Sequence, residues 1–162
     1  MNPKLTKLPY GLAGTIYRSS LPGSPLFDPG NQLLDAYLEA DVDTVVMLTP
    51  DDEARELTGM ELRDRYKTLG FDVIYAPVPD FSIPAPGEFR KPIQDSLEAA
   101  ESGKTIVIHC HAGVGRTGVF LSCLAKAVFE MQGEEAVAWV RQFIPHAVEN
   151  NLQYEFVKNF EY

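Results

Sequence analysis

The chain is poor in the residues on which several classes of protein depend. It has only two cysteines in 162 residues, too few for a disulfide framework. Positive charge is also scarce, because 14 Lys and Arg stand against 23 Asp and Glu, for a formal net charge of −9. This balance argues against broad binding to nucleic acid or to anionic lipid, since both need a positive surface. An anionic substrate must therefore bind at a local positive site.

Long apolar runs are missing as well. No stretch approaches the roughly 18 apolar residues of a membrane span, and the start, MNPKLTKLPYGL, has no apolar core of signal-peptide length. The apolar content of 45% and the charged content of 23% are ordinary for a soluble globular protein. We therefore expect one domain over residues 1–162, a cytoplasmic monomer without a nucleic-acid or membrane partner.

Short β-type runs alternate with helical patterns along the chain. The strand-like runs lie at 15–17, 44–48, 72–78 and 105–108. The last three are nearly continuous in apolar residues, as expected for strands buried on both faces. Helical spacing of apolar residues is found near 33–38, 62–69, 89–103, 115–133, 137–145 and 152–160. This alternation predicts an α/β domain with a central, mostly parallel sheet of four to five strands flanked by helices.

One passage, IVIHCHAGVGRTGVFLSCLAKAV at 106–128, joins the last of these strands to a helix through a glycine-rich turn. In such sheets ligands bind where the carboxyl end of a strand meets the next helix. Amides of such a turn form a nest for an anion, and the helix adds the positive end of its dipole. The residues predicted to bind phosphate here are His111, Ala112, Gly113, Val114, Gly115 and Arg116.

Cys110 lies at the floor of this turn. A free thiol has a pKa of about 8.5, and helix N-termini and nearby cations lower it to roughly 3.5–7.5. We therefore expect the Cys110 sulfur to be a thiolate and a nucleophile. Arg116 can bind two phosphate oxygens through one guanidinium, and Thr117 can place a hydroxyl near the sulfur, which favours its departure in a second step.

Residues 109–117 read His-Cys-x-x-Gly-x-x-Arg-Thr, which resembles the signature of the protein tyrosine phosphatase superfamily. The pattern Asp-Phe-x-x-Pro-x-Pro at 80–86 is similar to that of the small atypical dual-specificity phosphatases in particular. The resemblance implies the cysteine-phosphatase fold. It also implies hydrolysis of phosphate monoesters through a cysteinyl-phosphate intermediate, with neither a metal nor another cofactor.

Displacement of an alcohol or phenol from phosphate requires an acid that protonates the leaving oxygen. The resemblance implies that Asp80 is this acid, although aspartates are also common turn residues. Glu149 and Gln153 stand four apart at the start of a predicted helix, so they would share one face. The resemblance implies that they position the water that attacks phosphocysteine. In the alternative, Glu149 is first-turn charge and Gln153 a solvated polar residue.

Three functions remain open at this point. The first is a phosphatase for phosphotyrosine, with or without phosphoserine and phosphothreonine, acting on a phosphorylated protein or a small phosphate monoester. The second is an inositol phosphate or phosphoinositide phosphatase, which the absence of lysine from HAGVG at 111–115 disfavours. The third is a non-catalytic phosphate-binding module, which the presence of Cys110, Arg116 and Asp80 together disfavours. Cys123 lies in an apolar helical pattern and is expected to be a buried hydrophobe, the alternative being a redox partner for Cys110.

Overall fold

Five strands form one sheet in the order β1-β2-β5-β3-β4 in the computed structural model, which describes residues 5–162. They are β1 (Thr6–Leu8), β2 (Thr15–Ser19), β3 (Thr44–Met47), β4 (Asp72–Tyr75) and β5 (Thr105–His109). Strand β1 is antiparallel to β2, and the other neighbouring strands are parallel. The predicted mostly parallel sheet is confirmed.

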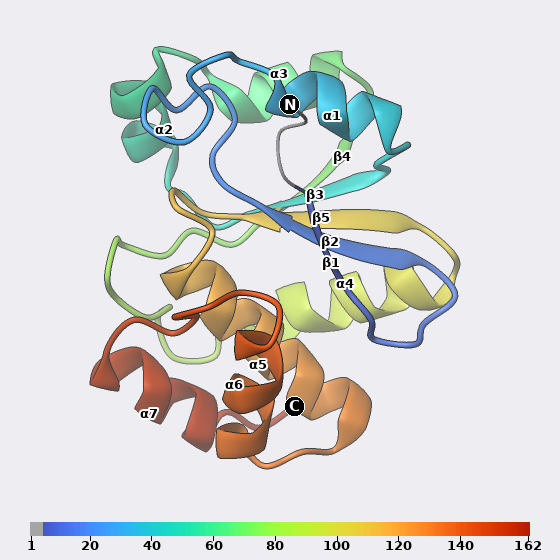
Figure 1. Ribbon diagram of the computed structural model, residues 1–162, viewed down its shortest axis with the longest axis vertical. Helices are drawn as coiled ribbons and strands as arrows, with labels where there is room; N and C mark the ends of the chain where they lie inside the picture. The colour runs from blue at the N-terminus through green and yellow to red at the C-terminus, as the bar shows by residue number, and fades with distance from the viewer. Residues whose placement is uncertain (1–4) are drawn as a thin grey trace.

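Helices cover both faces of the sheet (Figure 1). On one side lie α1 (Leu33–Glu39), α2 (Asp51–Thr58) and α3 (Leu62–Thr68), and on the other α4 (Arg90–Glu101), α5 (Gly115–Phe129), α6 (Gly133–Arg141) and α7 (Asn151–Asn159). Each side has its own apolar core, and that under α4 to α7 is the larger. None of the helices in residues 5–162 has the length and apolar character needed to cross a bilayer.

The two central strands and the edge strand differ in burial. Every residue of β3 is buried, as are Ile106–His109 of β5, because helices cover both faces there. Asp72 in β4 is exposed and the rest of that strand is only partly buried. The expectation of burial on both faces is therefore wrong for β4, which has a neighbour on one side only. This strand also ends before Pro77, whose missing N–H cannot join a ladder.

Two elements have no counterpart in the predictions from sequence. Strand β1 is three residues long, too short for a clear alternation. Helix α2 buries only Ala54, and Ala54 and Leu57 are the only apolar residues among its eight, too few to predict a helix from apolar spacing. Its first turn holds Asp51, Asp52 and Glu53, which the positive end of the helix dipole stabilises.

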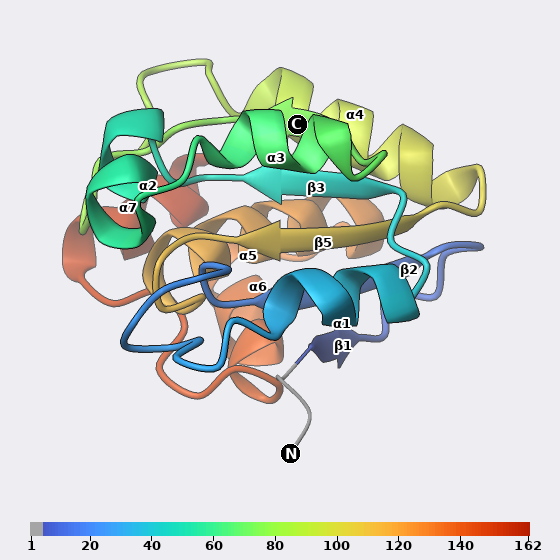
Figure 2. The same cartoon turned by 90° about the horizontal axis from the view of Figure 1, so that it is seen from above.

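The parallel strands point toward one edge of the sheet. Figure 2 shows the arrowheads of β3 and β5 directed to the side on which α2 and α7 lie. The loops that follow β2, β3, β4 and β5 all leave the sheet at this edge, as parallel strand order requires. Side chains from distant parts of the sequence therefore meet there.

Candidate active site

A cavity of ≈ 230 Å³ opens at this edge, directly beyond β5. Its walls are formed by Leu26, Phe27, Asp80, Phe81, Cys110, His111, Ala112, Gly115, Arg116 and Glu149. Seven of the eleven residues singled out from the sequence line it: Cys110, Arg116, Asp80, Glu149, His111, Ala112 and Gly115. The other four, Gly113, Val114, Thr117 and Gln153, are not among the residues that form these walls.

Cys110 follows the last residue of β5 and is 2% exposed. Helix α5 begins five residues later, at Gly115, and no side chain caps its N-terminus. Among residues 5–162, no protein acceptor is found for the amides of 111–114. These amides are therefore free to bind an anion beside the sulfur, whereas the Gly115 amide at the start of α5 bonds to Glu149.

Arg116 is buried and has four polar contacts. Its Nη1 donates to Glu53 Oε1 (3.1 Å) and to the Val78 carbonyl (2.9 Å), and its Nη2 donates to Glu53 Oε2 (2.8 Å). Nη2 also lies 3.1 Å from Asp80 Oδ1. Burial favours a lower pKa for Arg116, but the hydrogen bonds to Glu53 and the proximity of Cys110 raise the pKa above its ordinary value. The guanidinium therefore keeps its charge and is held in one orientation.

Glu53 is a site residue that the sequence did not indicate. It lies in α2, whose apolar pattern is too weak to predict a helix. The fork of two hydrogen bonds from Arg116 to one carboxylate fixes the guanidinium plane. Glu53 thereby positions Arg116 without lining the cavity itself.

Asp80 lies at the mouth of the cavity, with its side chain 49% exposed. Its Oδ1 accepts a hydrogen bond from the Phe81 amide (3.0 Å), so it also stabilises the local turn. Phe81 has a φ of 58° and is 62% exposed. The structure therefore shows the turn contact of the alternative interpretation and, in addition, a carboxylate that reaches the cavity.

Glu149 and Gln153 occupy different places. Glu149 precedes α7 and lines the cavity, and burial followed by the charge of Asp80 raises its pKa. Gln153 is buried within α7, where its Oε1 accepts from the Glu149 amide (2.8 Å) and its Nε2 donates to the Ser82 carbonyl (3.2 Å). The expectation that both lie on one face of a helix is wrong, because α7 begins only at Asn151.

The histidines on either side of Cys110 have different surroundings. His109 is buried, its Nδ1 donates to the Cys110 carbonyl (3.0 Å), and its Nε2 lies 2.7 Å from the Tyr66 hydroxyl. Burial lowers the pKa of His109 to about 4. His111 lines the cavity, bonds to Ser24 through Nε2 (3.1 Å) and packs against the edge of Phe27.

Thr117 and Cys123 are both buried in α5. The Thr117 hydroxyl has no hydrogen-bond partner among residues 5–162, so it stays available to a neighbouring group. Both cysteines are free, and burial raises the pKa of the Cys123 thiol far above its usual range. Cys123 is thus the buried hydrophobe expected from its apolar pattern.

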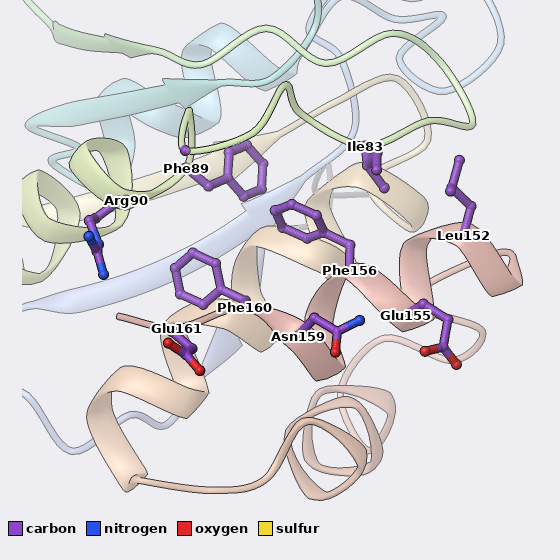
Figure 3. A pocket seen from close by; sticks show the side chains of 10 residues that line it. Ile83, Phe89, Arg90, Leu152, Glu155, Phe156, Asn159, Phe160 and Glu161 are labelled. Atoms are coloured by element: carbon purple, nitrogen blue, oxygen red, sulfur yellow. The ribbon is translucent and has the colours of Figure 1, made fainter.

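A second cavity, of ≈ 540 Å³, lies between the segment after Asp80 and α7 (Figure 3). Figure 3 shows Phe89, Phe156 and Phe160 pointing into it, with Ile83 and Leu152 at one end. Its walls hold charged side chains, Arg90, Glu155 and Glu161, but neither a cysteine nor a histidine. The smaller cavity is therefore the candidate active site, because a nucleophile, a cation and two carboxyl groups converge on it.

Comparisons with known proteins agree with this geometry. A family model described as "Polymorphic toxin system, DSP-PTPase phosphatase" matches residues 28–128. The chain is 35% identical over 85 residues to dual specificity protein phosphatase CDC14B of Mus musculus, which covers 52% of this chain and 17% of that protein. It is 37% identical over 62 residues to protein tyrosine phosphatase domain-containing protein 1 of Danio rerio, covering 38% of this chain and 9% of that protein. The chain thus spans less than a fifth of the length of either relative.

Solved structures show the same architecture. The crystal structure of Tk-PTP in the active form is 28% identical, with a TM-score of 0.73 over 90% of each chain. Kinase associated phosphatase, with its catalytic site cysteine replaced by serine, superposes with a TM-score of 0.86 over 97% of this chain and 93% of that chain. At 16% identity, that second likeness concerns the fold alone.

Proposed function

We propose a reaction for this chain from the premise that it belongs to the DSP-PTPase phosphatase family, whose model it matches over residues 28–128. In this proposal the protein hydrolyses phosphotyrosine esters through a cysteinyl-phosphate intermediate. In the first step the Cys110 sulfur attacks phosphorus, the ester P–O bond breaks, and Asp80 gives a proton to the leaving oxygen. In the second step water attacks the phosphocysteine, the P–S bond breaks, and inorganic phosphate leaves. The thiolate and the protonated acid are then restored.

One observation carries this proposal: Cys110, Arg116 and Asp80 meet in one cavity beside unpaired backbone amides. The amides and the Nε–H of Arg116, the guanidinium donor that Glu53, Val78 and Asp80 leave without a partner, can hold the equatorial phosphate oxygens while sulfur and leaving oxygen lie in line. Asp80 lines the same cavity with its side chain half exposed, which supports a role in protonating the leaving oxygen. Glu149 is the carboxyl group left to orient water in the second step, because Gln153 is engaged by Glu149 and Ser82 backbone groups.

The rim of the cavity supports an aromatic substrate. Leu26, Phe27 and Phe81 are exposed apolar side chains that line it and can flank a phenyl ring. Among the described residues that line it, Arg116 is the only arginine or lysine, and two carboxyl groups stand nearby. This favours one phosphate on an aryl group over a polyphosphorylated ring. We further propose that the substrate is a phosphoprotein in the cytoplasm, for which the two free cysteines give support.

The decisive experiment replaces the nucleophile. Cys110→Ser is expected to abolish hydrolysis of a phosphotyrosine peptide, because serine lacks an ionised nucleophile, while inorganic phosphate still binds. The assay is run on phosphotyrosine, phosphoserine and phosphothreonine peptides and on inositol phosphates, with and without chelator. Hydrolysis by Cys110→Ser at the native rate would refute the mechanism, and faster turnover of inositol phosphates would reassign the substrate.

Two further variants separate the half-reactions. Asp80→Asn is expected to lower kcat/KM by about 10²- to 10⁴-fold for alkyl phosphates and far less for p-nitrophenyl phosphate, whose leaving group needs little protonation. Glu149→Gln is expected to slow the second step, so that p-nitrophenol appears in a burst before the steady state. Equal effects of Asp80→Asn on good and poor leaving groups would contradict its role as the acid.

A further inference from the structure

We propose that Arg18, in strand β2, is the positioning residue that sets the orientation of the phosphate-binding loop at 110–116. The inference rests on the proposed function in one respect, since it assumes that this loop is the part that binds phosphate. Arg18 does not line the cavity and so would not touch the substrate. It would act through the loop backbone, from the side opposite the cavity.

The guanidinium of Arg18 contacts two successive carbonyl oxygens of the loop. Its Nε donates to the Gly113 carbonyl (2.7 Å) and its Nη2 donates to the Ala112 carbonyl (3.1 Å). The amide of Leu21, just beyond the end of β2, donates to the His111 carbonyl (2.8 Å). Three consecutive carbonyls of the loop are therefore held by one short segment at the end of β2.

These contacts fix the direction of the loop amides. In a trans peptide the C=O and N–H groups point in opposite directions. When the carbonyls of residues 111, 112 and 113 point toward β2, the amides of Ala112, Gly113 and Val114 point away from it. No protein acceptor is found for these amides within the described residues. The contacts from Arg18 therefore direct the amides toward the anion site, and no other hydrogen bond is lost.

The packing around Gly113 shows how closely the loop approaches Arg18. Gly113 has a φ of +75°, and a Cβ built on it would lie 2.4 Å from the Ser19 carbonyl oxygen and 2.8 Å from Arg18 Nε. Only glycine lets the backbone reach this distance. The register of β2 against β5 places Arg18 opposite Ile108, two residues before the loop. The third donor, Nη1, bonds to Thr6 Oγ1 (3.3 Å) in β1 and completes the anchoring of the side chain.

The charge of Arg18 acts on the same site. Burial lowers the pKa of Arg18, and the proximity of Cys110 opposes part of this shift, so the Arg18 cation lies close enough to the sulfur to act on it electrostatically. Arg18 thus contributes both geometry, through two donors at fixed spacing, and charge. A lysine could replace the charge but not the double contact, because its single ammonium does not match two carbonyls in one plane.

The test uses Arg18→Met, Arg18→Lys and, as a matched control, Thr6→Val, which removes the third contact and leaves both carbonyl bonds. Two readouts do not depend on turnover: the affinity for inorganic phosphate, and the pH dependence of Cys110 alkylation by iodoacetamide. Circular dichroism and thermal unfolding report whether each variant folds. Loss of two charge-assisted hydrogen bonds is expected to weaken phosphate binding by about ten- to a hundred-fold in Arg18→Met.

Arg18→Met should also shift alkylation to higher pH. Arg18→Lys should restore most of the native pH dependence of alkylation but not the native phosphate affinity. Thr6→Val should stay within about twofold of the native protein in phosphate affinity and in alkylation rate at each pH. If folded Arg18→Met binds phosphate as the native protein does, the inference is overturned. If Arg18→Met does not fold, Arg18→Lys decides, and native phosphate affinity in that variant overturns it equally. Should the native protein bind phosphate but hydrolyse no ester, the proposed function fails while this inference stands.

Discussion

Burial determines the charge of His109, which hydrogen-bonds to the Cys110 carbonyl. His109 donates from Nδ1 to the Cys110 carbonyl, so its Nε2 must accept from the Tyr66 hydroxyl when the ring is neutral. With a pKa lowered to about 4 by burial, the ring is neutral at physiological pH. His109 therefore holds the backbone at the sulfur by hydrogen bonding rather than by charge.

This neutral histidine predicts a pH-dependent stability. In the unfolded chain its pKa is near 6.5, so between pH 6.5 and about 4 the unfolded chain binds more protons than the folded one. The free energy of unfolding is expected to decrease as the pH is lowered through this window. The decrease from this residue is up to about 1.4 kcal/mol per pH unit. Urea unfolding at a series of pH values measures it. His109→Asn, which keeps a donor for the Cys110 carbonyl but does not titrate, should show a shallower slope, and equal slopes would contradict the assignment.

At the scale of elements, two helices make the site rigid. Helix α5 is buried from Gly115 to Ala125, as expected of a helix that is apolar on all sides. Asn150 caps the N-terminus of α7, where its side chain accepts from the Gln153 amide, while the Gln153 side chain accepts from the Glu149 amide. This reciprocal arrangement is close to a capping box and fixes the segment that carries Glu149 into the cavity.

The other end of α7 depends on one lysine of α5. Lys126 Nζ donates to the carbonyls of Val157 (2.8 Å), Lys158 (3.2 Å) and Phe160 (2.6 Å) at the helix C-terminus. The Val157 carbonyl also accepts from the Phe160 amide (3.3 Å). Lys126→Met keeps the apolar stem and removes these bonds. It is expected to lower the free energy of unfolding by about 1–3 kcal/mol and to leave kcat/KM for p-nitrophenyl phosphate nearly unchanged.

The matched control is Lys91→Met. Lys91 pairs with Asp95 on an exposed face of α4, so its loss should cost less than about 0.5 kcal/mol. Chemical denaturation of both variants makes the comparison. An effect of Lys126→Met no larger than that of Lys91→Met would show that the α7 end does not depend on Lys126.

The net charge of the whole molecule and the charge of the groups proposed to bind the anion have opposite signs. The chain has a formal net charge of −9, whereas we propose that its cavity holds an anion. The positive groups of the site are withdrawn from the surface, since Arg116 is buried and Arg18 lies behind the loop. The anion site therefore acts at short range, inside a field that repels anions at long range.

This contrast predicts a preference among substrates. A phosphotyrosine peptide with acidic flanking residues should have a lower kcat/KM than one with basic flanking residues. Raising the ionic strength should reduce this difference in kcat/KM. Screening is already strong at 0.1 M salt, where the Debye length is about 10 Å. A peptide with neutral flanks is the control. Preference for the acidic peptide at low salt would indicate a positive surface that the charge balance does not suggest.

The sequence by itself determined the parts of the site that are contiguous in the chain. Cys110 and Arg116 belong to one strand-turn-helix unit, in which the glycines, the apolar strand and the apolar helix all favour the same local structure. Asp80 was predicted only through the resemblance of residues 80–86 to the small atypical dual-specificity phosphatases, because its local pattern is equally that of a turn residue. Local signals of this kind predict a loop and its neighbours because hydrogen bonding within a turn depends on residues a few positions apart.

Only the tertiary structure decided which side chains support that unit. Glu53 bonds to Arg116 across 63 positions, Tyr66 to His109 across 43, and Arg18 to Gly113 across 95. Each contact depends on strand order, since β2 and β3 flank β5 and bring their following segments to its carboxyl end. The same order left Gln153 outside the cavity and Glu149 within it. Strand order is set by burial of the whole core, so no local pattern around these residues could have specified their partners.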